Sequence, residues 1–350
     1  MTGIRIEKLR QELSRFKLDN LLITKEINIS YLSGFKGEGG LLITPSKQIL
    51  VVDPRFTEQA AKEAPSFQIY RQQNFYPLEK SILRLIKKFK IKRLGFEASG
   101  ISYDFYQRLK NTIKPIKLSA CSNLVEQLRA IKSPQEIKLL KRAASLAMKT
   151  FAFAKKIIKP GKREAEAVAE IEYFMRKLGA DGCAFDTIVA SGKRSSMPHA
   201  PVSDKTIKNN ETVLIDLGCR VSGYNSDLTR IVFLGKISGK IKRNYEIVLQ
   251  AQQLAIKAVR AGARISQIDK IARQYIAKKG LRALFAHALG HGVGREVHEY
   301  PSISPRNQDI LKEGMVFTIE PGVYVPGLGG IRVEDMVLVT KNGHEVLTQT

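Results

Sequence analysis

Several features are missing from this sequence of 350 residues, and each absence excludes a class of protein. No apolar run approaches the ~20 residues that a membrane-spanning helix needs. The first residues, MTGIRIEKLRQEL, lack the apolar stretch and cleavage site of a signal peptide. Only three cysteines occur, widely scattered, so neither a disulfide framework nor a thiolate metal site is expected. We therefore predict a cytoplasmic protein with no membrane segment.

Acidic residues are also scarce, since 33 Asp and Glu stand against 58 Lys and Arg and the formal net charge is +25. Strongly basic domains often bind nucleic acid. Here the lysines lie along amphipathic segments such as SILRLIKKFKIKRLG, a pattern typical of solvated helix faces. No zinc-finger spacing, RNA-recognition aromatic motif or basic low-complexity tail accompanies them. We therefore expect no specific binding of nucleic acid.

The length suits two domains. Residues 1–122 alternate helix and strand patterns: an amphipathic helix from about Ile4 to Phe16 precedes the strand candidates NLLIT, GGLLIT, QILVVD and RLGFE. This alternation predicts an α/β domain with a mixed sheet. No glycine-rich phosphate-binding loop occurs in it. Residues 123–350 form the second predicted domain, which begins with a junction.

A strong helix start opens the second domain, with Ser133 as N-cap, Pro134 in the first turn and Glu136 at the third position. The dipeptide Pro-Gly at residues 160–161 ends this helix, and a second helix follows. Two more helices are expected between residues 241 and 279, with strands between and after the helix pairs. The second domain is thus predicted to be α+β.

Two strand-turn-strand segments in this domain resemble each other in layout, namely ETVLIDLGCRVSGYNSDLTRIVFLG and GMVFTIEPGVYVPGLGGIRVEDMVLVT. The first carries Asp216 and Asp227 on opposite arms, and the second carries Glu320 and Glu334 in the same way. Helices precede each segment. The repetition predicts an internal duplication, with two similar halves facing each other.

These four acids stand in apolar strand contexts, where a charge is expensive unless it is paired, hydrogen-bonded or bound to a metal. Two carboxylates brought together by a hairpin also repel, unless a cation lies between them. An ion pair with Lys or Arg would account for any single acid. Four acids in two matching segments favour a cation site.

The five histidines of the chain are grouped rather than scattered. His287, His291 and His298 fall in HALGHGVGREVHEYP, and His199 lies in SSMPHAP. A lone histidine is more often a core residue than a ligand, but the glycines around His291 would let its backbone approach a site closely. The spacing of His287 and His291 also permits a zinc site of the HExxH type. The Glu of that motif is missing, and the glycines disfavour a continuous helix.

Four carboxylates and the imidazole of His291 make an oxygen-rich site for two divalent metal ions. Such ligands suit Mn²⁺, and Co²⁺, Zn²⁺ or Fe²⁺ are alternatives. Metal ions ~3.5–4 Å apart can activate a water molecule and polarise a carbonyl group. The residues thus predict metal-assisted hydrolysis.

Together, the motifs closely resemble those of metallopeptidase family M24, the pita-bread peptidases, over residues 130–350. The family includes methionine aminopeptidase, Xaa-Pro aminopeptidase and Xaa-Pro dipeptidase (prolidase). The resemblance implies a pita-bread catalytic domain with pseudo-twofold duplication, behind an α/β domain of the creatinase/prolidase N-terminal type. Creatinase-like members lack the metal ligands, whereas every ligand position is filled here. The motifs are DLG with Asp216, SDLTR with Asp227, GHGVG with His291, TIEPG with Glu320 and RVED with Glu334.

The resemblance also implies a role for each ligand. Asp216 would bind one metal ion through both oxygens, and Asp227 and Glu334 would bridge the two ions. His291 and Glu320 would complete the second ion. Glu320 would also shuttle the proton of the nucleophilic water.

Four further residues are expected to act on the substrate. His199 and His298 resemble the family histidines that hold the scissile carbonyl and the tetrahedral intermediate. His287 matches a substrate-side histidine of the proline-specific members. Arg332 lies two residues before Glu334, so on one strand both side chains would face the same way. We expect Arg332 to brace the acidic ligands or to contact substrate, the alternative being a surface arginine.

A separate N-terminal domain, with the segments VVDPRFTEQA and IKSPQEIKLLKRA, resembles the proline-specific members. This implies a homodimer in which the N-terminal domain of one subunit caps the active site of its neighbour. A dipeptidase must recognise the free carboxylate of proline, usually with a cation. Many prolidases carry Arg after HExP, whereas HEYP is followed here by Ser302; Arg295 or an arginine of the N-terminal domain could serve instead.

We therefore predict an Xaa-Pro aminopeptidase, which acts on peptides with proline at the second position. Prolidase is the alternative within the family. A non-catalytic binding protein on the same fold is a remote alternative, since such proteins usually lose ligands.

Overall fold

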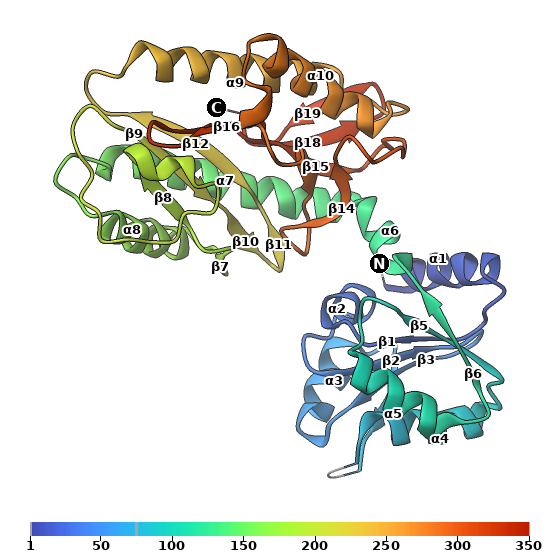
Figure 1. Ribbon diagram of the computed structural model, residues 1–350. Coiled ribbons are helices and arrows are strands. Elements are labelled where there is room, and N and C mark those ends of the chain that lie inside the picture. The colour runs from blue at the N-terminus through green and yellow to red at the C-terminus, as the bar shows by residue number, and fades with distance from the viewer. Residues whose placement is uncertain (1, 74–75, 350) are drawn as a thin grey trace. The chain divides into compact units, whose positions relative to one another are not determined.

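The computed structural model describes residues 2–73 and 76–349. The chain divides into two compact units, residues 1–129 and 130–350 (Figure 1). None of the helices in the described ranges combines the length and the apolar character needed to cross a membrane.

The first unit contains a mixed sheet with the strand order β4-β3-β2-β1-β5-β6. Strand β1 pairs parallel with β5 and antiparallel with β2, as expected for a mixed α/β domain. Its elements are α1 (Thr2–Arg15), β1 (Leu21–Ile23), α2 (Glu26–Ser33), β2 (Gly39–Ile43), β3 (Gln48–Val52), η1 (Pro54–Phe56), α3 (Thr57–Glu63), β4 (Gln68–Arg71), α4 (Leu78–Phe89), β5 (Arg93–Glu97), α5 (Tyr103–Ile113), β6 (Lys117–Cys121) and α6 (Leu124–Ala130).

Both faces of this sheet are covered, which explains the continuous apolar strand motifs. Successive residues of a strand point to opposite faces, so Leu21 and Ile23 lie in one core cluster and Leu22 in the other. Leu124 and Val125 of α6 pack in the first of these clusters. The boundary between the units therefore follows residue 129 rather than residue 122, because the junction forms a helix that belongs to the first core.

The second unit places helices α7 and α8 along one side of its strands and α9 and α10 along the other (Figure 1). Its principal sheets have the orders β12-β9-β8 and β14-β13-β15-β18-β19. Its elements are α7 (Pro134–Ile157), α8 (Glu164–Lys177), β7 (Gly182–Cys183), β8 (Ile188–Ser191), η2 (Gly192–Ser196), β9 (Thr212–Leu217), β10 (Cys219–Val221), β11 (Tyr224–Asn225), β12 (Leu228–Phe233), α9 (Gly239–Lys257), α10 (Ile265–Lys278), η3 (Arg282–Leu284), β13 (Gly290–Gly292), β14 (Glu299–Ile303), β15 (Val316–Ile319), β16 (Gly322–Val325), β17 (Gly329–Arg332), β18 (Asp335–Thr340) and β19 (Gly343–Val346).

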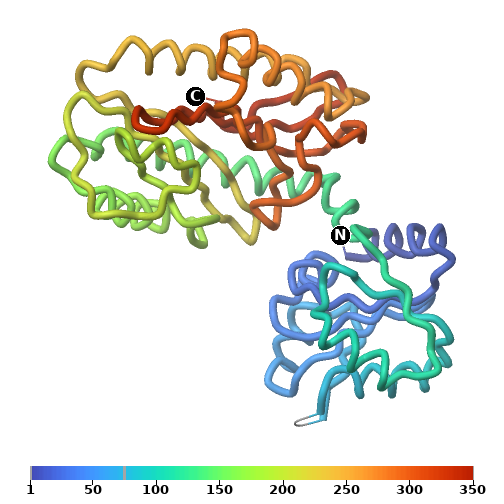
Figure 2. Tube along the Cα trace, in the orientation of Figure 1, coloured from blue at the N-terminus to red at the C-terminus, as the bar shows by residue number. Residues whose placement is uncertain are grey.

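The internal duplication of this unit is visible in its backbone hydrogen bonds. The residue before α8, Arg163, forms an isolated bridge with Thr206, and the residue before α10, Arg264, forms the same bridge with Ile310. The two halves lie side by side in the chain trace, the first from green to yellow and the second from gold to red (Figure 2). The predicted pita-bread architecture with two related halves is confirmed.

The register places equivalent acids at equivalent points of the two halves. Asp216 in β9 stands opposite Ile188 of β8. Glu320, directly after β15, donates its backbone N–H to the carbonyl of Leu289 at 2.8 Å, just before β13. In each half, therefore, one carboxylate on or next to the middle strand lies opposite the beginning of the adjacent strand, β8 in the first half and β13 in the second.

Candidate active site

Strand ends bring the four predicted acids to one cavity of about 1090 Å³ in the second unit. Asp227 lies directly before β12 and Glu334 directly before β18. Asp216 lies in β9, which pairs with β12, and Glu320 lies directly after β15, which pairs with β18. Asp216, Asp227 and Glu334 are buried, and Glu320 is partly exposed. Antiparallel pairing thus places two acids from each half in the same wall.

His291 stands among these carboxylates. Its Nε2 lies 3.3 Å from Oε1 of Glu320 and 3.6 Å from Oδ2 of Asp227. Asp227, His291 and Glu334 each offer one ligand atom, and these three atoms lie within 4.8 Å of one another. The structure therefore brings together four of the five residues that the motifs single out as ligands.

The fifth, Asp216, faces a guanidinium. Its Oδ2 accepts a hydrogen bond from Nη2 of Arg332. Its Oδ1 is buried and has no hydrogen-bond partner among the residues that the structure describes. Arg332 also donates from Nε to Oγ1 of Thr229 at 3.0 Å and from Nη1 to the hydroxyl of Tyr324 at 2.9 Å. Arg332 thus holds Asp216 at the edge of the acidic group.

Burial and mutual repulsion raise the pKa of three of these acids. Burial, followed by the charges of Glu334 and Asp216, raises the pKa of Asp227 well above its ordinary value. Burial, with Glu320 and Asp216, raises the pKa of Glu334 to about 8. Burial also raises the pKa of Asp216, although Arg332 opposes that change. The protein alone does not neutralise this cluster.

His291 and Glu320 form the exception. Burial lowers the pKa of His291, but the hydrogen bond to Glu320 and the surrounding carboxylates outweigh it and raise the pKa to about 9. Burial raises the pKa of Glu320, but the hydrogen bond and charge of His291 outweigh it, so this pKa lies below its ordinary value. Glu320 is therefore the acid of the group that is most readily ionised.

Divalent metal ions fit these residues. Among the described residues that line the cavity wall, four carboxylates surround one buried guanidinium and the imidazole of His291, so the acidic groups outnumber the basic ones. One buried carboxylate oxygen, Oδ1 of Asp216, has no protein donor among the described residues, and one imidazole stands between two acids. An oxygen-rich donor set with one nitrogen is typical of Mn²⁺ and related ions.

The other predicted histidines line the same cavity. The side chains of His199 and His298 are exposed there, and the rings of His298 and His291 lie 4.2 Å apart, centroid to centroid. Burial, with the charge of His291, lowers the pKa of His298, and burial lowers the pKa of His287. Neutral imidazoles of this kind offer one N–H donor and one acceptor each.

The tautomer of His287 follows from its contacts. Its Nδ1 lies 2.8 Å from the carbonyl of Ala288, which requires a proton on Nδ1. Its Nε2 then accepts from the hydroxyl of Tyr324 at 3.2 Å, and that hydroxyl accepts from Arg332. The backbone of His287 is held by Arg273, which donates to its carbonyl at 2.9 Å.

The glycines around His291 allow close strand packing. A Cβ atom at Gly290 would lie 1.9 Å from the carbonyl oxygen of Thr318, and one at Gly292 would lie 2.4 Å from that of Tyr300. Any side chain at either position would push β13 away from a neighbouring chain segment. The sequence predicted a close approach of this backbone to a site, whereas the close approaches at Gly290 and Gly292 are to the backbone of neighbouring segments.

Two residues of the site were not singled out from the sequence. Thr229 donates to Oε2 of Glu334 at 2.7 Å and accepts from Arg332, so it connects the two halves. Its position two residues after Asp227 was an available signal, since residues two apart on a strand share a face. Tyr324 carried no such signal. The single strand expected through Arg332 and Glu334 is two strands, since β17 ends at Arg332 and pairs with β16, while β18 begins at Asp335 in another sheet.

Comparisons with known proteins agree with this geometry. The family model "Metallopeptidase family M24" matches residues 138–341, and "Creatinase/Prolidase N-terminal domain" matches residues 5–131. The chain is 39% identical to the Xaa-Pro dipeptidase of Pyrococcus furiosus over 99% of this chain and 98% of that protein.

Solved structures of similar fold are also proline-specific peptidases by name. The Xaa-Pro dipeptidase from Bacillus anthracis is 38% identical, with a TM-score of 0.96 over 100% of this chain and 98% of that one. The X-Pro aminopeptidase from Thermotoga maritima is 37% identical, with a TM-score of 0.87 over 97% of this chain and 98% of that one. The chain therefore belongs to metallopeptidase family M24 and is a metal-dependent peptidase with a creatinase/prolidase N-terminal domain.

Proposed function

We propose that this protein is an Xaa-Pro dipeptidase, which hydrolyses the bond between a first residue and a C-terminal proline. The observation that carries the proposal is the convergence of four carboxylates and His291 at one wall of the cavity. Full-length relatives named Xaa-Pro dipeptidase support the substrate class. They favour the dipeptidase alternative over the aminopeptidase that we predicted from the sequence.

In this proposal two divalent ions, Mn²⁺ by donor preference, are held by the five ligand residues. When bound, the metal ions supply an activated water and polarise the scissile carbonyl. The ligands are Asp216, Asp227, His291, Glu320 and Glu334.

The chain's own residues supply the remaining steps. The pKa of Glu320 is lowered and its side chain is partly exposed in the cavity, so its carboxylate can accept a proton and return it to the leaving nitrogen. His199 and His298 donate hydrogen bonds toward the carbonyl oxygen as it gains negative charge. Arg332 keeps Asp216 oriented, and its charge opposes the rise in the pKa of Asp216.

Recognition of the proline carboxylate needs hydrogen-bond donors. Among the described residues that line the cavity, Arg332 is the single Lys or Arg, and Asp216 already pairs with it. The hydroxyl of Ser302 also lines the cavity and is exposed. We infer that neutral donors, Ser302 and the histidines, take part in binding this carboxylate within the second unit.

Xaa-Pro aminopeptidase is the second candidate, because Ser302 replaces the arginine of many prolidases and one similar solved structure carries that name. Hydrolysis of Ala-Pro and of Ala-Pro-Ala by protein loaded with Mn²⁺ decides between them. A dipeptidase cleaves Ala-Pro with the higher kcat/KM, whereas an aminopeptidase cleaves the tripeptide faster. Hydrolysis of neither peptide, with Mn²⁺, Co²⁺ or Zn²⁺, would contradict both candidates and favour a binding protein.

The homodimer implied by the family resemblance is part of the proposal, and light scattering gives the mass in solution. Residence in the cytoplasm stays a prediction from the sequence.

A further inference from the structure

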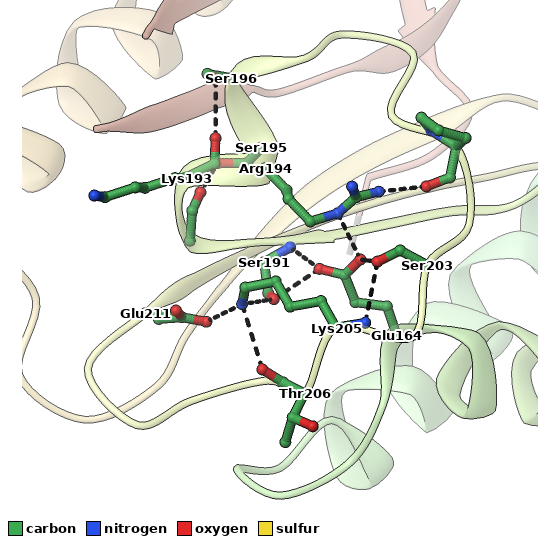
Figure 3. A network of polar contacts seen from close by, with 12 residues as sticks. Glu164, Ser191, Lys193, Arg194, Ser195, Ser196, Ser203, Lys205, Thr206 and Glu211 are labelled. Carbon is green, nitrogen blue, oxygen red and sulfur yellow. Dashed lines mark hydrogen bonds and ion pairs between the residues drawn. The ribbon is translucent and has the colours of Figure 1, made fainter. Parts of the chain in front are cut away.

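Glu164, the first residue of α8, is a fully buried carboxylate outside the predicted ligand set. Oε1 accepts hydrogen bonds from the backbone N–H and the hydroxyl of Ser191, both at 2.7 Å. Oε2 accepts from Nε of Arg194 at 2.9 Å and from the hydroxyl of Ser203 at 2.6 Å (Figure 3). Each oxygen therefore has two donors, which is the full capacity of a carboxylate.

All four donors belong to residues 191–203, which we call the His199 segment. Ser191 ends β8 and Ser203 lies after His199, so Glu164 contacts the segment on both sides of the histidine. Lys205 extends the network, since its Nζ donates to the hydroxyl of Ser191 at 2.6 Å and to Glu211 at 2.8 Å (Figure 3). Glu164 thus joins two ends of one segment.

The middle of the His199 segment contacts the acidic site itself. The carbonyl of Pro198, the residue before His199, accepts from Nη1 of Arg332 at 3.1 Å. The hydroxyl of Ser195 accepts from the backbone N–H of Gly330 at 2.8 Å, in the strand that ends at Arg332. The segment is consequently fixed at its two ends by Glu164 and in its middle by β17, with the His199 side chain exposed in the cavity.

Helix formation alone does not require an acid at this position. Ile265 begins α10 in the second half, after the same backbone bridge, and is fully buried. The same turn therefore forms with an apolar residue. Burial of a carboxylate destabilises the fold unless hydrogen-bond donors compensate it. We therefore look for the role of Glu164 in the residues that donate to it.

We propose that Glu164 is a positioning residue that holds the His199 segment and so sets the place of the His199 imidazole in the cavity. This inference rests on the proposed peptidase function, in which His199 contacts the substrate. The substitution that tests it is Glu164→Gln, which keeps the shape but replaces one acceptor oxygen with an NH₂ donor facing the segment's own donors.

The first experiment is a double-mutant cycle on Xaa-Pro hydrolysis. Glu164→Gln should lower kcat/KM roughly 10- to 100-fold, as expected for a small displacement of a substrate-contacting group. In the His199→Ala background it should have almost no further effect, whereas its effect should multiply with that of His298→Ala. An equal fold-loss in the His199→Ala background would overturn the proposal.

Glu170→Gln is the matched control, because Glu170 lies on the same helix and its pair with Lys162, at 2.7 Å, is partly exposed. It should leave kcat/KM unchanged.

Ser203→Ala is the milder variant if Glu164→Gln does not fold, because it removes only the hydroxyl donor at the C-terminal end of the His199 segment. It should show the same coupling with His199→Ala, with a smaller loss of kcat/KM.

A second experiment does not depend on activity. Amide hydrogen exchange should quicken across residues 191–203 in Glu164→Gln while the rest of α8 and the bound metal content stay as in the unsubstituted protein. Unchanged exchange in the segment would overturn the proposal. If the unsubstituted protein hydrolyses no Xaa-Pro peptide, the proposed function fails, and the exchange result still decides whether Glu164 holds the segment.

Discussion

The two halves of residues 130–350 enter their second helices through the same backbone hydrogen bonds, but different side chains stand at the matching positions. Gly161 donates to Ile207 at 2.9 Å in the first half, and Gly262 donates to Leu311 at 2.9 Å in the second. The backbone plan is therefore shared. The two halves differ in their chemistry because different side chains occupy equivalent backbone positions.

The clearest difference concerns the segments that carry His199 and His298. His298 directly precedes β14, whose backbone pairs with β13, so a strand ladder orders its segment. In the part of the chain that the structure describes, no strand lies between Ser191 and Thr212. The side chain of Glu164 instead accepts hydrogen bonds from both ends of the His199 segment. One half uses main-chain pairing, and the other uses a carboxylate.

The proposed metal ligands show the same division between the two halves. Each half supplies two acids, but the imidazole comes from β13 alone, where His291 stands two residues after Leu289. The matching position of β8, two residues after Ile188, is the buried Ala190. The site is therefore complete only when both halves contribute.

The largest expected effect tests that dependence on both halves. Asp227→Ala and Glu334→Ala remove one buried acid from each half, and each should lower kcat/KM by at least about 1000-fold, because several kcal/mol of metal-derived stabilisation are lost. Bound metal, measured by elemental analysis, should fall in both. Normal turnover in either variant would show that one half suffices.

The next prediction concerns the stability of the segment that carries His298 and leads into β14. Nζ of Lys132 lies 2.9 Å from Oε1 of Glu299, the first residue of β14, and both side chains are buried, at 1% and 3% exposure. Lys132→Met leaves the carboxylate of Glu299 in the interior without this partner, so the free energy of unfolding should fall by about 3–5 kcal/mol. Denaturation in urea measures it.

Lys141→Met is the control for that prediction. Lys141 pairs with Glu345 at 2.7 Å, and both side chains are 45% exposed. Solvent screens this pair, so the loss should stay below about 1 kcal/mol. Equal losses in the two variants would mean that the buried pair does not stabilise the β14 side.

His298→Ala should lower kcat by about 100-fold, as for removal of one donor to a developing oxyanion, with the metal content retained. His291→Ala should lose metal as well as activity, although the two rings are in contact. Loss of metal in His298→Ala would place His298 among the ligands and overturn this distinction.

The last prediction is confined to the metal-free protein and is a pH dependence of its stability. The pKa of Glu334 is raised from 4.5 to about 8 on burial near Glu320 and Asp216. When folding raises the pKa of a carboxyl group, the folded protein loses stability as the pH rises from the pKa of the unfolded state to that of the folded state. Below the unfolded-state pKa the group costs nothing. Metal-free Glu334→Gln should therefore melt above the metal-free unsubstituted protein at about pH 8 and gain nothing near pH 4. Scanning calorimetry in chelator measures this, and a constant difference at both pH values would contradict it.

Much of the fold could be predicted from the sequence because the central strands are apolar throughout. The motifs NLLIT, GGLLIT, QILVVD and RLGFE became β1, β2, β3 and β5. The edge strands β4 and β6 were missed, since several of their residues are exposed and their sequences carry no apolar run. The capping residues Ser133 and Glu136 gave the start of α7 correctly, because that signal is local.

The candidate ligands could also be found from the sequence, since charges inside apolar strands are conspicuous by themselves. Tyr324 and Glu164 could not, because each acquires its part in the site through residues far along the chain, and the position of Thr229 two residues after Asp227 predicts the face that it shares but not its bonding partners. The bond from Thr229 to Glu334 and the bonds from Glu164 to the His199 segment exist only in the folded state. Periodicity and motifs do not encode such pairings.

The central claim is that five side chains from both halves enclose a pair of metal ions beside the substrate cavity. Anomalous X-ray diffraction from crystals grown with Mn²⁺ tests it most directly. The account predicts two manganese peaks among Asp216, Asp227, His291, Glu320 and Glu334, with each half contributing ligands. A cavity without manganese at saturating concentration, or with ions held by one half alone, would contradict it.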